Sequence, residues 1–334
     1  RASYGVIGNQ NINPYTFTPS MSVNNKATSW IIDDTYVTSI SSLPALVSQN
    51  FTWEKVGTIN VGLDVNLFNN RLSGVFEWYQ RNTNGMLAPG VQLPAVVGAS
   101  APYQNTADMR TRGWELSLNW RDQIGKVGYR IGFNLSDYKS EIIKYDDNAA
   151  TKLLSSYYPG QTLGEIWGYV VDGYYTVDDF VDTSSWQLKE GVTSINGYNV
   201  RPGDVKFKNL RDDDTSTNVI TSGDNTFDNP GDRKVIGNTT PRYQYGINLG
   251  MNYAGFDLNV ILQGTGKRDY WISNVLTFPM NGDNFVPLFE GLSDYWMPKD
   301  PDNGDWSAVN PNAKYPRIYG NRGNSGSNLR QSDK

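Results

Sequence analysis

The sequence predicts an all-β protein, a transmembrane antiparallel β-barrel with long loops, and three observations lead to this fold class. Apolar and polar residues alternate in paired runs, a turn of a few residues joins each pair, and the runs are long enough to cross a membrane as tilted strands. Side chains on a strand point alternately to its two faces, so alternation gives each strand an apolar face and a polar face. In such a barrel the apolar face meets lipid and the polar face lines the interior.

Three hairpins fit this pattern, and a partial strand at residues 1–9 precedes them. Their strands span 59–67 with 72–81, 113–120 with 127–135, and 243–253 with 256–262. Tight turns are predicted at Asn69-Asn70, Asp122 to Gly125, and Ala254-Gly255. The segments between hairpins are long: 10–52, 82–112, 137–241 and 265–334. Because outer-membrane barrels place short turns in the periplasm and long loops outside the cell, we expect the tight turns to be periplasmic.

The alternation also assigns a face to individual residues. We expect Leu63, Ile131 and Leu249 to face hydrocarbon. Five polar residues are expected to face the lumen: Asp64, Asn66, Glu115, Asn134 and Asn248. Tryptophan and tyrosine gather near the strand ends, as is typical of the aromatic girdles at the two membrane–water interfaces.

A soluble β-sandwich is the alternative, because its strands alternate as well. The predicted strands run for about 9–12 residues, the length needed to span a bilayer, whereas strands of soluble proteins average about half that. The contrast between short turns and long loops favours the barrel too. Counting the partial strand gives seven strands, and an open sheet of that size in lipid would leave two unpaired edges. We therefore expect a piece of a larger barrel, one of about 22 strands around a plug.

The composition limits the chemistry. The chain has no cysteine and no histidine, which removes thiol nucleophiles, the commonest metal ligand and the commonest general base. Acidic pairs such as Glu165 and Asp172 exist, but nothing selects one pair for catalysis. A net charge of −5 and a pI near 4.9 argue against nucleic-acid binding. We expect no enzymatic activity, no cofactor and no metal site.

A series of motifs carries a closer resemblance. It includes Arg112-Gly113-Trp114-Glu115, Gly164-Glu165-Ile166-Trp167-Gly168-Tyr169, Arg201-Pro202-Gly203-Asp204, Gly231-Asp232-Arg233-Lys234-Val235-Ile236-Gly237 and Thr240-Pro241-Arg242-Tyr243. In this order and spacing they resemble the C-terminal half of the SusC/RagA family of TonB-linked outer-membrane transporters, over about residues 55–275. Two segments depart from the family pattern. Asn105-Thr106-Ala107 lacks a glycine, and the acidic stretch 212–232 has a broken calcium-loop spacing, so a solvated acidic loop is favoured there.

The resemblance implies a function. Members of the family import nutrient oligomers across the Gram-negative outer membrane, chiefly oligosaccharides and in some cases peptides. TonB acts on a plug inside the barrel, and a SusD-like surface lipoprotein covers the extracellular loops. On this view residues 1–334 belong to one barrel domain, and the plug, the TonB box and the final strands lie outside this chain. A passive porin and a secreted glycan-binding β-protein remain as alternatives from other classes.

Aromatic residues are dense in the two longest loops. Tyrosine and tryptophan combine a large rigid surface with a polar group, which suits stacking on sugars and protein interfaces. The alternative is that these rings pack the loops internally. As binding candidates for ligand or partner we select Trp167, Tyr169, Tyr174, Tyr175, Tyr270 and Trp271.

Overall fold

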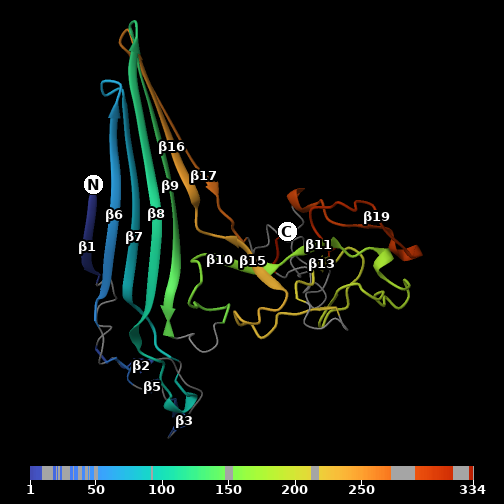
Figure 1. Ribbon diagram of the computed structural model, residues 1–334. Helices are drawn as coiled ribbons and strands as arrows, with labels where there is room; N and C mark the ends of the chain where they lie inside the picture. Colours follow the sequence, from blue (N-terminus) through green and yellow to red (C-terminus); the bar gives the residue numbers. More distant parts are fainter. Residues whose placement is uncertain are drawn as a thin grey trace. The chain divides into compact units, whose positions relative to one another are not determined.

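The protein is described from a computed structural model (Figure 1). It describes residues 1–9, 18–19, 21, 23–24, 31–32, 34–36, 40–41, 44, 46–48, 52–91, 93–146, 153–211, 218–271, 290–318 and 331–333. The chain divides into two units. We call residues 1–163 with 241–267 the wall unit, and residues 164–240 with 268–334 the loop unit.

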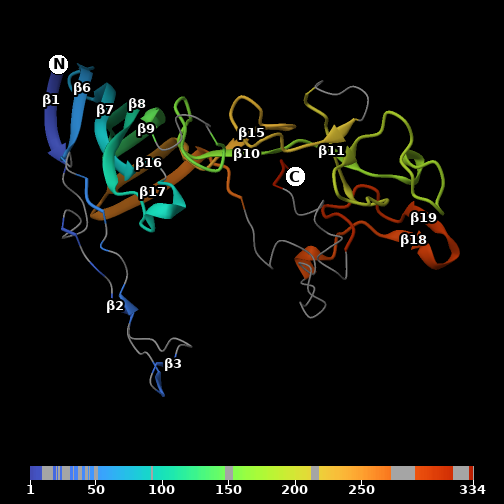
Figure 2. The same cartoon turned by 90° about the horizontal axis from the view of Figure 1, so that it is seen from below.

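The wall unit is built on one seven-stranded antiparallel sheet. In spatial order its strands are β1 (Ala2–Asn9), β6 (Glu54–Leu67), β7 (Leu72–Pro89), β8 (Tyr103–Ile124), β9 (Val127–Tyr145), β16 (Arg242–Tyr253) and β17 (Phe256–Lys267). Figure 1 shows these strands lying side by side, and Figure 2 shows the same strands arranged along a curve. The predicted all-β antiparallel fold, with one partial and six full strands, is confirmed. The total of about 22 strands stays a prediction.

Tight turns join the three hairpins at one end of the sheet (Figure 1). Asn69 and Asn70 adopt φ of 55° and 65°, and Ala254-Gly255 follow with 49° and 87°. Left-handed backbone of this kind matches the twist of paired strands, and asparagine and glycine adopt it at the lowest cost. The turn residues therefore fix the register of these two hairpins. In the third, β8 continues to Ile124, so the turn is Gly125-Lys126 rather than the predicted Asp122 to Gly125.

The predicted strand lengths were too short. The strands β7, β8 and β9 contain 18, 22 and 19 residues, so much of 82–112 and the start of 137–241 is strand rather than loop. Alternation stops marking a strand once both faces become polar, but the backbone ladder continues. The added lengths of these strands share a small hydrophobic core, which supports the extension. It consists of Ala88, Ala107, Ile142 and Tyr145.

The described parts of the segments before β6 and between β7 and β8 contain short elements. Before β6 lie β2 (Val23–Asn24), β3 (Ile31–Ile32), β4 (Thr35–Tyr36) and β5 (Ile40–Ser41), and a 3₁₀ turn (Ala95–Val97) lies between β7 and β8. Asn105-Thr106-Ala107, where the family pattern has a glycine, continue β8, and the register against β7 shifts at this point. Among the described residues, no helix is long and apolar enough to cross a membrane.

The loop unit combines short strands with 3₁₀ turns. Its strands are β10 (Glu165–Tyr169), β11 (Val171–Tyr174), β12 (Ser194–Ile195), β13 (Val205–Phe207), β14 (Val219–Ile220), β15 (Arg233–Asn238), β18 (Pro298–Asp300) and β19 (Asp305–Ala308). Among the described residues of this unit, three 3₁₀ turns accompany them, at Val177–Asp179, Glu290–Leu292 and Pro301–Asn303. The pairs β10–β15, β11–β13 and β18–β19 are antiparallel, and β12–β14 is parallel. The prediction that residues 1–334 form one barrel domain makes this unit an extracellular insertion, and that stays a prediction.

Candidate functional site

The polar face of the wall sheet is the first candidate site. Residues paired across antiparallel strands share a face, so the register assigns a face to every side chain in the sheet. The five residues predicted to face the lumen all lie on one face, and all are exposed: Asp64, Asn66, Glu115, Asn134 and Asn248. Leu63, Ile131 and Leu249 share the opposite face. Which face meets the lumen stays a prediction.

Hydrogen bonds and ion pairs link side chains across the polar face. The Arg1 guanidinium lies 3.1 Å from Asp64 and also binds Glu77. Farther along the sheet, Arg130 Nη2 donates to Asn259 Oδ1 at 2.5 Å. Such a surface is wettable and carries both charges, which suits contact with water or with polar groups of a ligand or a neighbouring domain.

The curved polar face also has a concave region. It encloses about 620 Å³ and is lined in part by Arg130, Asn248 and Asn259. Gly250 lies beneath the Arg130 side chain, and a Cβ at position 250 would collide with that side chain. The glycine therefore lets the arginine lie flat along the wall.

The loop unit holds the second candidate site, and here the predicted residues separate into two groups. Tyr169, Tyr174 and Tyr175 are buried in its hydrophobic core, together with residues such as Phe207 and Trp296. The Tyr174 hydroxyl donates to the Ala313 carbonyl at 3.0 Å. Burial of these three rings favours the alternative that they pack the unit internally, and it leaves them little surface to offer a ligand.

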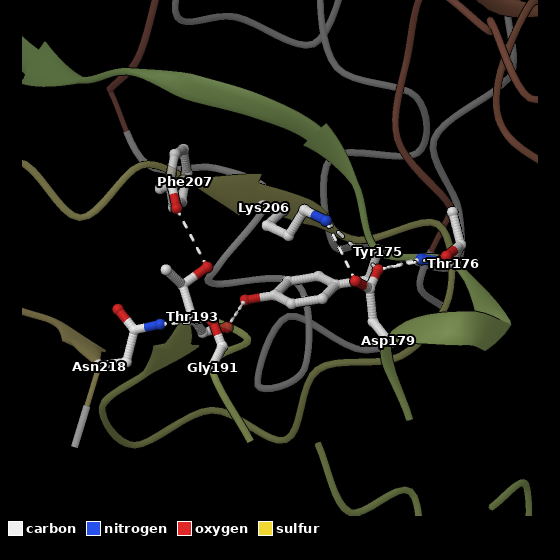
Figure 3. A network of polar contacts seen from close by, with 8 residues as sticks. All are labelled: Tyr175, Thr176, Asp179, Gly191, Thr193, Lys206, Phe207 and Asn218. Atoms are coloured by element: carbon white, nitrogen blue, oxygen red, sulfur yellow. Dashed lines mark hydrogen bonds and ion pairs between the residues drawn. The ribbon is translucent and has the colours of Figure 1, made fainter. Parts of the chain in front are cut away.

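Tyr175 is the centre of a polar network in this core (Figure 3). Its hydroxyl donates to the Thr193 carbonyl at 2.6 Å, and the Lys206 ammonium lies 6.0 Å from its ring centroid. Lys206 in turn binds Asp179 at 3.1 Å, and Asp179 accepts a hydrogen bond from the Thr176 amide at 2.7 Å. Each of these polar groups thus has a partner, as buried polar groups require.

Burial also changes the acidity of these phenols. Loss of solvation raises the pKa of Tyr174 to about 12, with a smaller contribution from the Asp294 carboxylate. Burial likewise raises the pKa of Tyr175 well above its ordinary value, and the hydrogen bond to Thr193 opposes that shift. Both tyrosines are therefore neutral hydrogen-bond donors at physiological pH.

The other three aromatic candidates lie at the surface of the loop unit. Trp167 is partly exposed, packs edge-on against Phe227 at 6.4 Å between centroids, and donates its indole N–H to Glu165 at 3.3 Å. Tyr270 is 71% exposed, and Trp271 is partly exposed. These three remain the residues that could contact a ligand or partner, which stays a prediction.

Two buried aspartates were not selected from the sequence. Asp204 is fully buried and accepts from the Arg201 amide at 2.7 Å and from Arg317 Nε at 3.4 Å. Asp232 accepts from the amides of Leu210 and Thr221 at 2.9 and 2.7 Å. Both belong to the motifs quoted above, so their place in those motifs was the available signal.

The acidic stretch 212–232 is described only in part, because residues 212–217 lie outside the described residues. In the described portion, Asp224 is exposed, and hydrogen bonds from Thr226 lower the pKa of its carboxyl. Across the described chain, no cluster of three or more acidic side chains is arranged to hold a metal ion. The favoured interpretation of a solvated acidic loop stays a prediction.

Among known proteins, the chain is similar in sequence to TonB-dependent receptors. No family profile matches the chain. It is 29% identical over 280 residues to TonB-dependent receptor P3 of Formosa agariphila, a match that covers 79% of this chain and 25% of the relative. It is 31% identical over 147 residues to TonB-dependent receptor SusC of Bacteroides thetaiotaomicron, which covers 43% of this chain and 14% of that relative.

Solved structures share the fold. The RagAB peptide transporter matches with a TM-score of 0.63 and 21% identity, and the match covers 98% of this chain and 32% of that chain. The RagAB peptide importer in its closed-closed state matches with a TM-score of 0.65 and 22% identity. This chain spans about a quarter of the length of the first receptor named above and about a third of the transporter chain.

Proposed function

We propose that this chain, which is similar to TonB-dependent receptors, forms wall and outer loops of an active nutrient importer in the Gram-negative outer membrane. The cargo would be a nutrient oligomer, taken up by a receptor that TonB energises. The observation that carries this proposal is the sheet with one apolar and one polar face, found in a chain similar to TonB-dependent receptors.

The two faces support transport through the barrel. The apolar face, with Leu63, Ile131 and Leu249 all exposed, suits hydrocarbon. The polar face, with Asp64 and Glu115, suits a hydrated lumen that holds a plug. On this proposal cargo passes along the polar face when the plug moves, and no covalent bond is made or broken. The relatives are receptors and transporters rather than enzymes, which supports that view.

Oligosaccharides are the proposed cargo class, and peptides are the alternative. The resemblance to the family favours oligosaccharides, because most members import them. The solved structures with the same fold are of a peptide transporter, which supports the alternative. Trp167 is partly exposed and Tyr270 is exposed, and aromatic rings suit stacking on either a sugar or a peptide group.

We propose that a SusD-like lipoprotein covers the loop unit. The described part of the unit has its own core, so it presents a defined surface. The exposed rings of Tyr270 and Phe227 give that surface apolar points of contact. The TonB-contacting segment and the plug would belong to other parts of the receptor.

Uptake measurements in whole cells test the proposal against its rivals. Deleting the gene for the full receptor should abolish uptake of a labelled oligosaccharide, and so should dissipating the proton-motive force or deleting TonB. Uptake that persists without TonB would indicate a passive porin and contradict the proposal. A deletion strain that loses only peptide uptake would support the alternative cargo. Recovery of the receptor in the soluble fraction without detergent would support the secreted β-protein instead.

A further inference from the structure

On the apolar face of the wall unit, successive rows of paired residues change from aliphatic and aromatic side chains to charged ones toward the long ends of the strands. One row across β7, β8 and β9 is apolar and consists of Phe76, Leu116 and Leu135. The next row toward the long ends of the strands begins with Trp78 paired to Trp114. Tryptophan favours the membrane–water interface, so this row marks the boundary of the lipid-facing region.

The row beyond the tryptophans carries two cations side by side. Arg112 of β8 is paired with Lys139 of β9, and both side chains are exposed. Arg112 Nε donates to Gln80 Oε1 at 2.8 Å, which holds the guanidinium beside the sheet. Within the described part of the chain, neither cation forms an ion pair with an acidic side chain.

The pairing of Arg112 with Lys139 is electrostatically unfavourable unless an anion binds between them. Like charges directly opposite each other on paired strands repel, because their Cβ atoms are only about 5 Å apart. The acidic residues nearest in the sheet already face other cations. Asp137, one row below, is bound by Arg242, and Glu141, one row above, is paired in register with Arg110. The Arg112–Lys139 pair therefore keeps a local positive charge.

We propose that Arg112 and Lys139 form a binding site for the phosphate of a glycolipid headgroup in the outer leaflet. Their row follows the tryptophan row, at the depth where headgroup phosphates lie. The tight turns lie at the opposite end of the strands, which places this row on the extracellular side. Arginine binds phosphate oxygens through two parallel N–H donors, and lysine adds a mobile point charge.

The position of the pair favours a lipid over a soluble anion. Both side chains share a face with Trp114 and Leu116, so the acyl chains of a bound lipid would lie along the apolar rows. A free phosphate would gain only the charge contacts. The site lies on the outside of the barrel and takes no part in the import route, so it goes beyond the function proposed above.

Native mass spectrometry of the full receptor tests this site. Receptor purified in mild detergent should carry phosphorylated glycolipid, and the double variant R112Q/K139Q should bind it about 25-fold more weakly, at roughly fivefold for each charge removed. The matched control is R81Q. Arg81 lies next to Gln80 on β7, but its side chain points to the opposite face, so this variant should bind lipid normally.

Further arms identify the ligand and guard against misfolding. Heat-modifiability on gels should be unchanged in each variant, and the charge-conserving double variant R112K/K139R should retain most of the binding. Glycolipid stripped of phosphate should bind the wild type as weakly as intact glycolipid binds R112Q/K139Q, and inorganic phosphate should not compete at millimolar concentration. Equal lipid retention by R112Q/K139Q and the wild type would overturn the proposal. So would an equal loss in R81Q, or a preference for phosphatidylglycerol over the glycolipid.

Discussion

The wall unit and the loop unit place their apolar side chains in opposite ways. In the wall unit large apolar residues are exposed; Leu63 is 61% and Phe256 80% exposed. In the loop unit Tyr175 and Ile220 are fully buried. The first pattern suits a sheet whose apolar face meets lipid, and the second is that of a protein that folds in water.

The two units also differ in what holds them together. Long ladders of backbone hydrogen bonds join the strands of the wall, so its register depends little on any single side chain. The loop unit has no strand longer than six residues among those described, and its short pairs rely on a shared aromatic core and on buried pairs such as Asp204 with Arg317. Core substitutions should therefore damage the loop unit and spare the wall.

The largest effect is expected from Tyr175→Ala. Removing a fully buried aromatic ring typically costs about 3–5 kcal/mol, and it would also leave the Thr193 carbonyl without its donor. The loop unit should become sensitive to protease in intact cells, while the barrel stays heat-modifiable on gels. Tyr175→Phe keeps the ring and should have a much smaller effect. Loss of heat-modifiability in Tyr175→Ala would contradict the separation of the two units.

Arginine substitutions on β9 test the wall in the same way. Arginine at mid-membrane on the lipid face costs about 2–4 kcal/mol, whereas the lumen face tolerates it. Ile131→Arg should therefore reduce assembly into the outer membrane, and Asn134→Arg on the opposite face should assemble normally. The amount of folded receptor in membrane fractions measures this. Equal yields of the two variants would mean that the faces are assigned wrongly.

Alkaline pH should weaken the loop unit before the wall. The pKa of Tyr174 is raised from 10.0 to about 12, so the neutral phenol stabilises the folded unit, and this contribution is complete below pH 10. It is lost as the pH rises from 10 to about 12, and the total loss is about 3 kcal/mol. The loss of stability should appear as a rise in the protease sensitivity of the loop unit when it is measured at increasing pH. Burial also raises the pKa of Tyr175, so Tyr174→Phe should reduce this dependence and Tyr174→Phe combined with Tyr175→Phe should remove most of it. An unchanged profile in the double variant would assign the dependence to other groups.

A smaller effect is expected from the exposed aromatic residues. Trp167→Ala combined with Tyr270→Ala should weaken the lipoprotein partner or the cargo by about 1–2 kcal/mol, because rings at the edge of an interface contribute modestly. Co-purification of the partner and uptake measure this. Val309→Ala, another exposed apolar residue of the loop unit, is the control. If neither partner binding nor uptake changes, these rings only pack against their own unit.

Cysteine labelling should reveal the orientation with almost no effect on stability. Asn70 lies in a tight turn of the wall, and Thr183 is exposed in the loop unit. An impermeant thiol reagent added to intact cells should label Thr183→Cys and leave Asn70→Cys unlabelled. Both should react after the outer membrane is permeabilised. Labelling of Asn70→Cys in intact cells would reverse the proposed topology and, with it, the leaflet assigned to the Arg112–Lys139 site.

Alternation alone predicted the hairpins and which of the residues selected in the wall share a face. This worked because side-chain direction repeats every two residues and the Asn69-Asn70 turn leaves little freedom of register. Strand length was not predictable in the same way, because beyond Trp78 and Trp114 both faces become polar and the alternation signal ends.

The loop unit was far harder to predict. Tyr174 is hydrogen-bonded to Ala313, and Asp204 to Arg317, and more than a hundred residues of chain separate the partners in each pair. No local pattern distinguishes these buried residues from Trp167, which lies at the surface. The density of aromatic residues was consistent with rings that pack the loops internally and with rings that bind a ligand or partner. Only the long-range packing in the structure shows which rings are buried.

One short ladder in the loop unit has an evolutionary consequence. The pairing of β10 with β15, and the hydrogen bond from the Thr239 amide to the Gly164 carbonyl at 2.8 Å, bring the two ends of the segment 164–240 together. Doubling the residues enclosed by such a junction costs only about 0.6 kcal/mol of closure entropy. The enclosed sequence can therefore change in length at little entropic cost, provided that it keeps the core it shares with Trp296 and Ala313. Insertions at its surface would alter the exposed loops, while the strands of the wall keep their register.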